Sequence, residues 1–228
     1  MTHSHRSLVR EQPRRIGTPW TVLWWDAITR PTISTFRRLL DEPDTSLSRS
    51  LLWIFAATLA AGVISWGISP GFLRTSPITG DISWSVGIDI YVLVGLPAFL
   101  VELFVVHLLA RRLGGDAPFA QTAFLMACYA APLLVLAGLI SGVETLVTAE
   151  GGFPLRPYGL SLVSATYGVT LVGLVARALI TLAHAALDVV TVRTVYQLEG
   201  WRAAVPSLLY LAFSFFALIL ALVPVPVM

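Results

Sequence analysis

Five stretches of the sequence are apolar over a length that crosses a lipid bilayer as a helix. A helix rises about 1.5 Å per residue and the hydrocarbon core is roughly 30 Å thick, so about 20 apolar residues suffice. Only 12% of the residues are charged, which is about half the share in a soluble domain. The sequence therefore predicts an all-α, polytopic membrane protein with five transmembrane helices, at residues 51–69, 86–110, 119–143, 158–182 and 203–223.

Small residues predict where these helices meet and end. Small residues that recur every four positions let the backbones of two helices approach closely. This pattern occurs in the first and third spans. The residues are Ala57, Ala61, Ser65 and Ser69 in the first span, and Gly138 and Gly142 in the third. Gly114, just after the second span, predicts a helix stop with the glycine in the left-handed conformation. The fourth helix is expected to continue to Tyr196, since neither glycine nor proline interrupts it before Gly200.

The residues before the first span differ from the rest of the chain. Residues 1–17 form a basic tail that is predicted to be disordered. Residues 18–46 contain an amphipathic segment and a linker, and residues 47–228 form the membrane domain. The tryptophans and arginines of the amphipathic segment are typical of a helix in the lipid headgroup region. Docking of the same apolar face on the ends of the bundle is the alternative. The interfacial candidates are Trp20, Trp24, Arg30, Pro31, Phe36, Arg37 and Arg38.

The distribution of arginine predicts the orientation. All fifteen basic residues are arginine, and twelve of them flank one side of the predicted spans. That side comprises the N-terminal segment and the loops after the second and fourth spans. Only Arg74 and Arg156 flank the other side. Because arginine is enriched in cytoplasmic loops, we expect the N-terminus in the cytoplasm and the C-terminus outside.

Ionisable residues inside the spans are the candidates for chemistry, since a charge in lipid is costly. They are Asp89, Glu102, His107, Arg177, His184 and Asp188. Glu102 in the second span and Arg177 in the fourth span are expected at a similar depth in the membrane, which suggests that they pair. His107, His184 and Asp188 are expected to form a polar layer at the cytoplasmic edge, with His184 and Asp188 on one helix face. A purely structural role, with pairing or snorkelling to the interface, is the alternative to a transport or proton-relay role.

Enzyme and cofactor motifs are absent from the sequence. It has no phosphate-binding loop, no HExxH, no CxxC and no GxSxG. Cys128 is the only cysteine, so an intrachain disulfide and a cysteine metal cluster are excluded. His3 and His5 have no third ligand nearby. We therefore predict no enzymatic activity, no cofactor and no metal site.

The end of the second span, the loop after it and the third span contain His107, Gly114, Gly115, Phe119, Tyr129 and Pro132. In these residues the chain resembles the central hairpin of prokaryotic Yip1-domain proteins, and the resemblance extends over residues 25–223. It implies a five-span bundle in a bacterial inner membrane, with a cytoplasmic N-terminus. It implies no agreed biochemical activity. The acidic Tyr-Gly-Pro pattern that precedes the first span in eukaryotic members is missing, so Rab-type GTPase binding is not carried over.

The sequence favours a non-enzymatic protein that binds or organises membrane proteins or lipids. Two alternatives stay open. One is a small transporter or channel subunit that uses Glu102, Arg177, His107 and His184. The other is an accessory subunit of a larger membrane complex. The expected partners are membrane lipids, another membrane protein or a second copy of the chain, and nucleic acid is not expected.

Overall fold

Seven helices make up the part of the chain that the computed structural model describes, which is residues 17–68, 84–149 and 171–222. No strand occurs in these ranges. In chain order the helices are α1 (Trp20–Thr29), α2 (Ile33–Leu40), α3 (Leu47–Ile68), α5 (Trp84–Arg112), α6 (Phe119–Ala149), α8 (Leu171–Val195) and α9 (Trp201–Leu222). The predicted all-α class is therefore confirmed for the described residues.

Four of these helices are long and apolar enough to cross a membrane. Their apolar segments are Leu47–Ser65, Leu93–Arg112, Phe119–Val143 and Gly173–Val195. The predicted fifth span coincides with α9, whose side chains are described only as far as Ala212, so five spans remain a prediction. The fourth helix does continue to Val195, as expected. Its predicted beginning at residues 158–170 lies outside the described residues, as does the basic tail 1–16.

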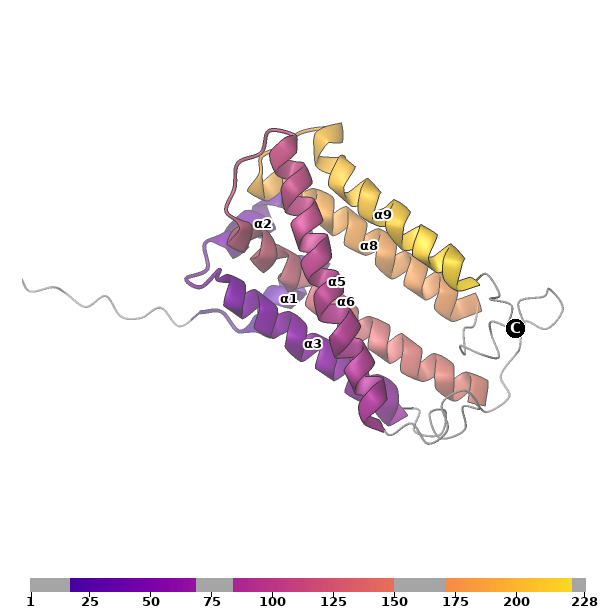
Figure 1. Ribbon diagram of the computed structural model, residues 1–228. Coiled ribbons are helices and arrows are strands. Elements are labelled where there is room, and N and C mark those ends of the chain that lie inside the picture. Colours follow the sequence, from indigo (N-terminus) through magenta and orange to yellow (C-terminus); the bar gives the residue numbers. More distant parts are fainter. Residues whose placement is uncertain (1–16, 69–83, 150–170, 223–228) are drawn as a thin grey trace, which may run out of the picture.

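Helix α6 is the centre of the bundle (Figure 1). Every residue from Thr122 to Ala131 is buried. A helix with one side facing lipid would expose part of such a segment. Helix α3 packs along one side of α6, and α8 packs along another. Helix α9 lies beside α8 and also contacts α5. The apolar residues that a bilayer demands thus also form the interior of the protein.

Close backbone contact joins α3 to α6 and α5. Ala57 and Ala61 are buried, and a Cβ atom on Gly138 would lie 2.6 Å from the Cα and carbonyl oxygen of Ala61. A Cβ atom on Gly95 of α5 would lie 2.6 Å from Cγ2 of Thr58. Ala57 and Ala61 of the predicted ridge are therefore used inside the bundle, whereas Ser65 is partly exposed and Ser69 lies outside the described residues.

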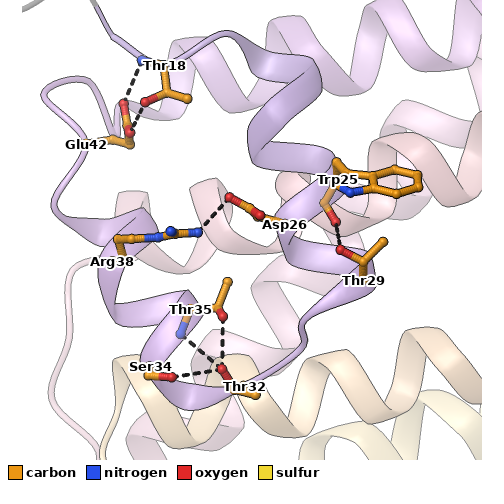
Figure 2. A network of polar contacts seen from close by, with 9 residues as sticks. All are labelled: Thr18, Trp25, Asp26, Thr29, Thr32, Ser34, Thr35, Arg38 and Glu42. Carbon is orange, nitrogen blue, oxygen red and sulfur yellow. Dashed lines mark hydrogen bonds and ion pairs between the residues drawn. The ribbon is translucent and has the colours of Figure 1, made fainter.

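Helices α1 and α2 form a hairpin that docks on the bundle with one face. Leu23 and Ala27 of α1, with Phe36 and Leu39 of α2, are buried in the same core as α6. Figure 2 shows the polar contacts of this hairpin: Arg38 donates to Asp26 at 2.6 Å, and Thr18 donates to Glu42 through its backbone N–H and its hydroxyl. The hydroxyl of Thr32 caps α2 by accepting from the N–H of Thr35, which fits the break at Pro31.

The turn between α5 and α6 ends α5 with a Schellman motif. The N–H of Gly115 donates to the carbonyl of Ala110, and the N–H of Gly114 donates to that of Arg111. Gly114 has a φ of 100°, the left-handed conformation that favours glycine at this position. The predicted role of Gly114 as a helix stop is confirmed.

Replacing Gly138 with alanine should destabilise the protein although alanine favours helices. The new methyl group meets the backbone of Ala61, which cannot rotate away, and such overpacking costs about 1–3 kcal/mol. Gly95→Ala is the matched control, because its methyl group meets only the side chain of Thr58. Thermal unfolding in detergent should show the larger drop for Gly138→Ala. Equal or reversed drops would contradict the close α3–α6 contact.

Candidate functional site

A cavity of about 950 Å³ lies between α5, α6, α8 and α9. Most of its lining is apolar and includes Phe99, Val106, Leu133, Ala137, Ile180 and Pro206. Its polar lining is Glu102 on α5, His184 on α8 and Tyr210 on α9. Val101 and Leu209 also line it and are 64% and 53% exposed, so the cavity opens sideways, toward the region that lipid occupies around a membrane bundle.

Glu102, His184 and Asp188 meet at the wall of this cavity. His184 Nε2 lies 3.0 Å from Glu102 Oε1 and 3.9 Å from Asp188 Oδ1. The His184–Glu102 contact is an ion pair by distance, but the two atoms are not aligned for a hydrogen bond. The Glu102 and His184 side chains are about nine-tenths buried, and that of Asp188 is completely buried. Two carboxyl groups and one imidazole therefore share a small volume in an apolar surrounding.

Aromatic side chains hold this cluster in place. The hydroxyl of Tyr129 on α6 donates to Oδ1 of Asp188. The imidazole of His184 packs edge-on against Tyr129 and stacks on Tyr210 at an interplanar angle of 30°, with centroid distances of 5.2 and 5.0 Å. Phe36 of α2 also stacks on Tyr129, with a centroid distance of 6.3 Å. The amphipathic hairpin thus contacts the aromatic ring that orients Asp188.

A second polar cluster joins the α5–α6 turn to the end of α8. The hydroxyl of Tyr196 lies within hydrogen-bonding distance of His107 Nδ1, and 2.7 Å from Thr122 Oγ1. Phe119 packs edge-on against His107 at 5.1 Å. A Cβ atom on Gly115 would lie 2.7 Å from Cβ of Tyr196, so the turn touches Tyr196 directly. Burial raises the pKa of the Tyr196 hydroxyl, which stays protonated and can donate.

The predicted pairing of Glu102 with Arg177 is wrong. Glu102 contacts His184, whereas Arg177 donates to Ser141 Oγ on α6 at 3.2 Å. Arg177 precedes His184 by seven residues, about 10 Å along the helix, so it lies at a different depth. The predicted polar layer is also divided: His184 and Asp188 belong to the Glu102 cluster, and His107 belongs to the Tyr196 cluster. Asp89 lies on α5, and its side chain is outside the described residues.

The candidate interfacial residues fall into three groups. Trp20, Arg30, Pro31, Arg37 and Arg38 are exposed, Trp24 is partly buried against the core, and Phe36 is completely buried. Phe36 therefore does not face lipid, because its ring fills the space beside Tyr129. The exposed face of α1 also carries Val22, Trp25 and Ile28. One face of the α1–α2 hairpin therefore docks on the bundle, while an apolar face of α1 stays exposed.

Five of the six family-marker residues lie at or beside the two clusters, and the sixth, Pro132, lies inside α6. The turn beside the end of α8 contains Gly114 and Gly115, and the side chains of His107 and Phe119 pack at the same place. Tyr129 donates to Asp188 and so orients it. A family model described as the Yip1 domain matches residues 25–222. The chain belongs to the Yip1 domain family. No curated protein and no solved structure matches it. For a Yip1-family protein, the markers thus coincide with the tertiary contacts that join α5, α6 and α8.

Sequence reasoning missed three tyrosine roles in this Yip1-domain chain. Tyr129 was singled out only as a family marker, Tyr196 only as a helix end, and Tyr210 not at all. Each places its ring or hydroxyl against a histidine. A tyrosine in an apolar run gives only a weak signal, since its hydroxyl needs some partner when it is buried.

Removing the hydroxyl of Tyr196 should loosen the turn. Tyr196→Phe loses contacts with both Thr122 and His107, and each lost hydrogen bond costs about 0.5–1.5 kcal/mol. Thr122→Val removes one of the same contacts, so the double variant should be less destabilised than the sum of the single variants. Equilibrium unfolding of the four proteins measures this coupling. Strict additivity would exclude the Tyr196–Thr122 contact.

Proposed function

We propose that this Yip1-family protein binds membrane lipid in the cavity between α5 and α9 and thereby organises lipids or proteins around it. No enzymatic step is involved. The observation that carries the proposal is the lateral cavity itself, about 950 Å³ in volume and bordered by the exposed residues Val101 and Leu209. This volume is at the upper end of the roughly 300–1,000 Å³ of small-molecule sites.

The lining supports an amphipathic occupant. Apolar residues from four helices offer an acyl chain a surface without hydrogen-bonding groups. Glu102, His184 and Tyr210 together form one polar corner, which suits an ester or hydroxyl group of the same lipid. Lipid that entered sideways would not need a route through water.

A transport role has one observation in its favour, the ionisable cluster in the cavity wall. The rest of the lining is apolar, which disfavours a hydrated path for an ion. An accessory-subunit role loses one of its supports, because Ala57, Ala61 and Gly138 are covered by helices of the same chain. Lipid binding is therefore the function that we put first.

The outer face of α1 provides the second part of the proposal. Trp20, Val22, Trp25 and Ile28 are between 37% and 70% exposed on a helix whose other face is docked. We propose a place for the hairpin at the cytoplasmic surface of the cell membrane, with the N-terminus inside and the C-terminus outside. In that place the exposed tryptophans contact headgroups or a neighbouring protein.

Filling the cavity should release bound lipid. Ala137→Phe places a ring in the lining, whereas Leu136→Phe changes the adjacent residue, which is 42% exposed and not part of the lining. Native mass spectrometry of protein extracted in a mild detergent should show retained lipid in the wild type and in Leu136→Phe, but not in Ala137→Phe. Equal retention in all three, or none in the wild type, would contradict lipid binding in this cavity.

Substituting two neighbouring tryptophans should distinguish the contribution of α1 to membrane contact from its contribution to folding stability. Trp25 is 70% exposed, whereas Trp24 packs edge-on against Trp53 in the core. Trp24→Ala should lower the melting temperature, since truncating a fully buried aromatic ring costs about 3–5 kcal/mol and the partly buried Trp24 should lose a share of that. Trp25→Ala should leave it nearly unchanged and reduce tryptophan quenching by brominated lipids in reconstituted vesicles. Unchanged quenching would argue against an interfacial α1.

A further inference from the structure

We propose that Glu102, His184 and Asp188 form a binding site for a divalent transition-metal ion. The site goes beyond the proposed lipid binding and does not rest on it, because its ligands come from the protein alone. Its three donors are one imidazole nitrogen and two carboxylate oxygens, a combination that suits zinc, manganese or iron better than calcium or magnesium. The fold brings them together from α5 and α8, which sequence spacing did not reveal.

The distances between the donors fit one ion. In a tetrahedral zinc site, ligands at 2.0–2.2 Å from the metal stand roughly 3.3 Å from one another. Here Nε2 of His184 is 3.0 Å from Glu102 Oε1 and 3.9 Å from Asp188 Oδ1, and one donor atom from each residue lies within 4.8 Å of the others. Side-chain movements of at most about 1.5 Å, the difference between 4.8 Å and the spacing of tetrahedral ligands, would bring all three donors to one ion.

Buried polar atoms without a hydrogen bond provide the independent observation. Glu102 Oε1 and His184 Nε2 lie 3.0 Å apart as an ion pair but are not hydrogen-bonded, and Asp188 Oδ2 makes no hydrogen bond either among the described residues. An unsatisfied polar atom in an apolar interior costs about 1–3 kcal/mol, and more if it is charged. These three atoms belong to side chains that are about nine-tenths buried or more. A metal ion among the three side chains would be a shared partner for Glu102 Oε1 and His184 Nε2, and for Asp188 through either of its carboxylate oxygens.

The surroundings also match a metal centre. Tyr129 donates to Oδ1 of Asp188, and a hydrogen bond of this kind to a ligating carboxylate orients the carboxylate and strengthens metal binding. When both carboxyl groups are ionised, a protonated His184 balances only one of them, and Tyr129 and Tyr210 bring no positive charge. A divalent ion balances both. Glu102 and His184 line the cavity, which leaves room for a further ligand such as water or the polar group of a lipid.

The test uses full-length protein purified without a histidine tag and exchanged through EDTA into detergent. Titration with Zn²⁺ and, separately, Mn²⁺ should show one ion bound per chain by calorimetry and by elemental analysis after dialysis. Glu102→Gln and Asp188→Asn should each weaken binding at least tenfold, and Tyr129→Phe should weaken it by about 10- to 100-fold. Substituting His3 and His5 with alanine should leave the affinity and the stoichiometry unchanged.

A spectroscopic measurement on the wild type covers the case in which a variant fails to fold. Co²⁺ bound to the intact protein should give visible bands of a site with nitrogen and oxygen ligands and no sulfur, and Zn²⁺ should displace it. The proposal is overturned if the wild type binds no ion after EDTA exchange. It is also overturned if binding survives in folded Glu102→Gln and Asp188→Asn, or disappears when His3 and His5 are replaced.

Discussion

Charge that is buried in an apolar surrounding must be compensated, and this constraint governs the middle of the bundle. Glu102 reaches from α5 to His184 on α8, and Asp188 one turn later accepts from Tyr129 on α6. Phe36 of α2 then packs on Tyr129. A single line of contacts thus connects the amphipathic hairpin with three helices of the bundle. Without it, each carboxyl group would stand alone where desolvation is most costly.

The remaining packing divides the bundle into a tight side and an open side. Helices α3 and α6 approach until Gly138 touches the backbone of Ala61, which leaves no space between them. Helices α5 and α9 instead border the cavity. A tightly packed pair of helices beside a lateral opening suits a protein that binds an apolar molecule without changing its own helix packing. The Glu102–His184 contact lies on the open side, in the lining of the cavity.

Much of the architecture could be predicted from the sequence, whereas the side-chain partners could not. The length of the apolar run predicted the third span at 119–143, the same segment that the structure gives. The tolerance of glycine for a positive φ predicted the turn at Gly114. Depth along a helix suggested Arg177 as the partner of Glu102, but depth does not give the rotation of one helix about another. His184 and Tyr129 were found only from the packed bundle. The burial of Phe36 likewise depends on a partner ring that is distant in sequence.

A double-mutant cycle between Glu102 and His184 tests the central contact most directly. Glu102→Gln, His184→Gln and the double variant would be compared with the wild type by equilibrium unfolding, with EDTA present so that no metal contributes. Residues in direct contact show coupling free energies of about 0.5–3 kcal/mol, and we expect a value in this range. Additivity within about 0.3 kcal/mol would show that α5 and α8 do not meet through these side chains, and would contradict the account.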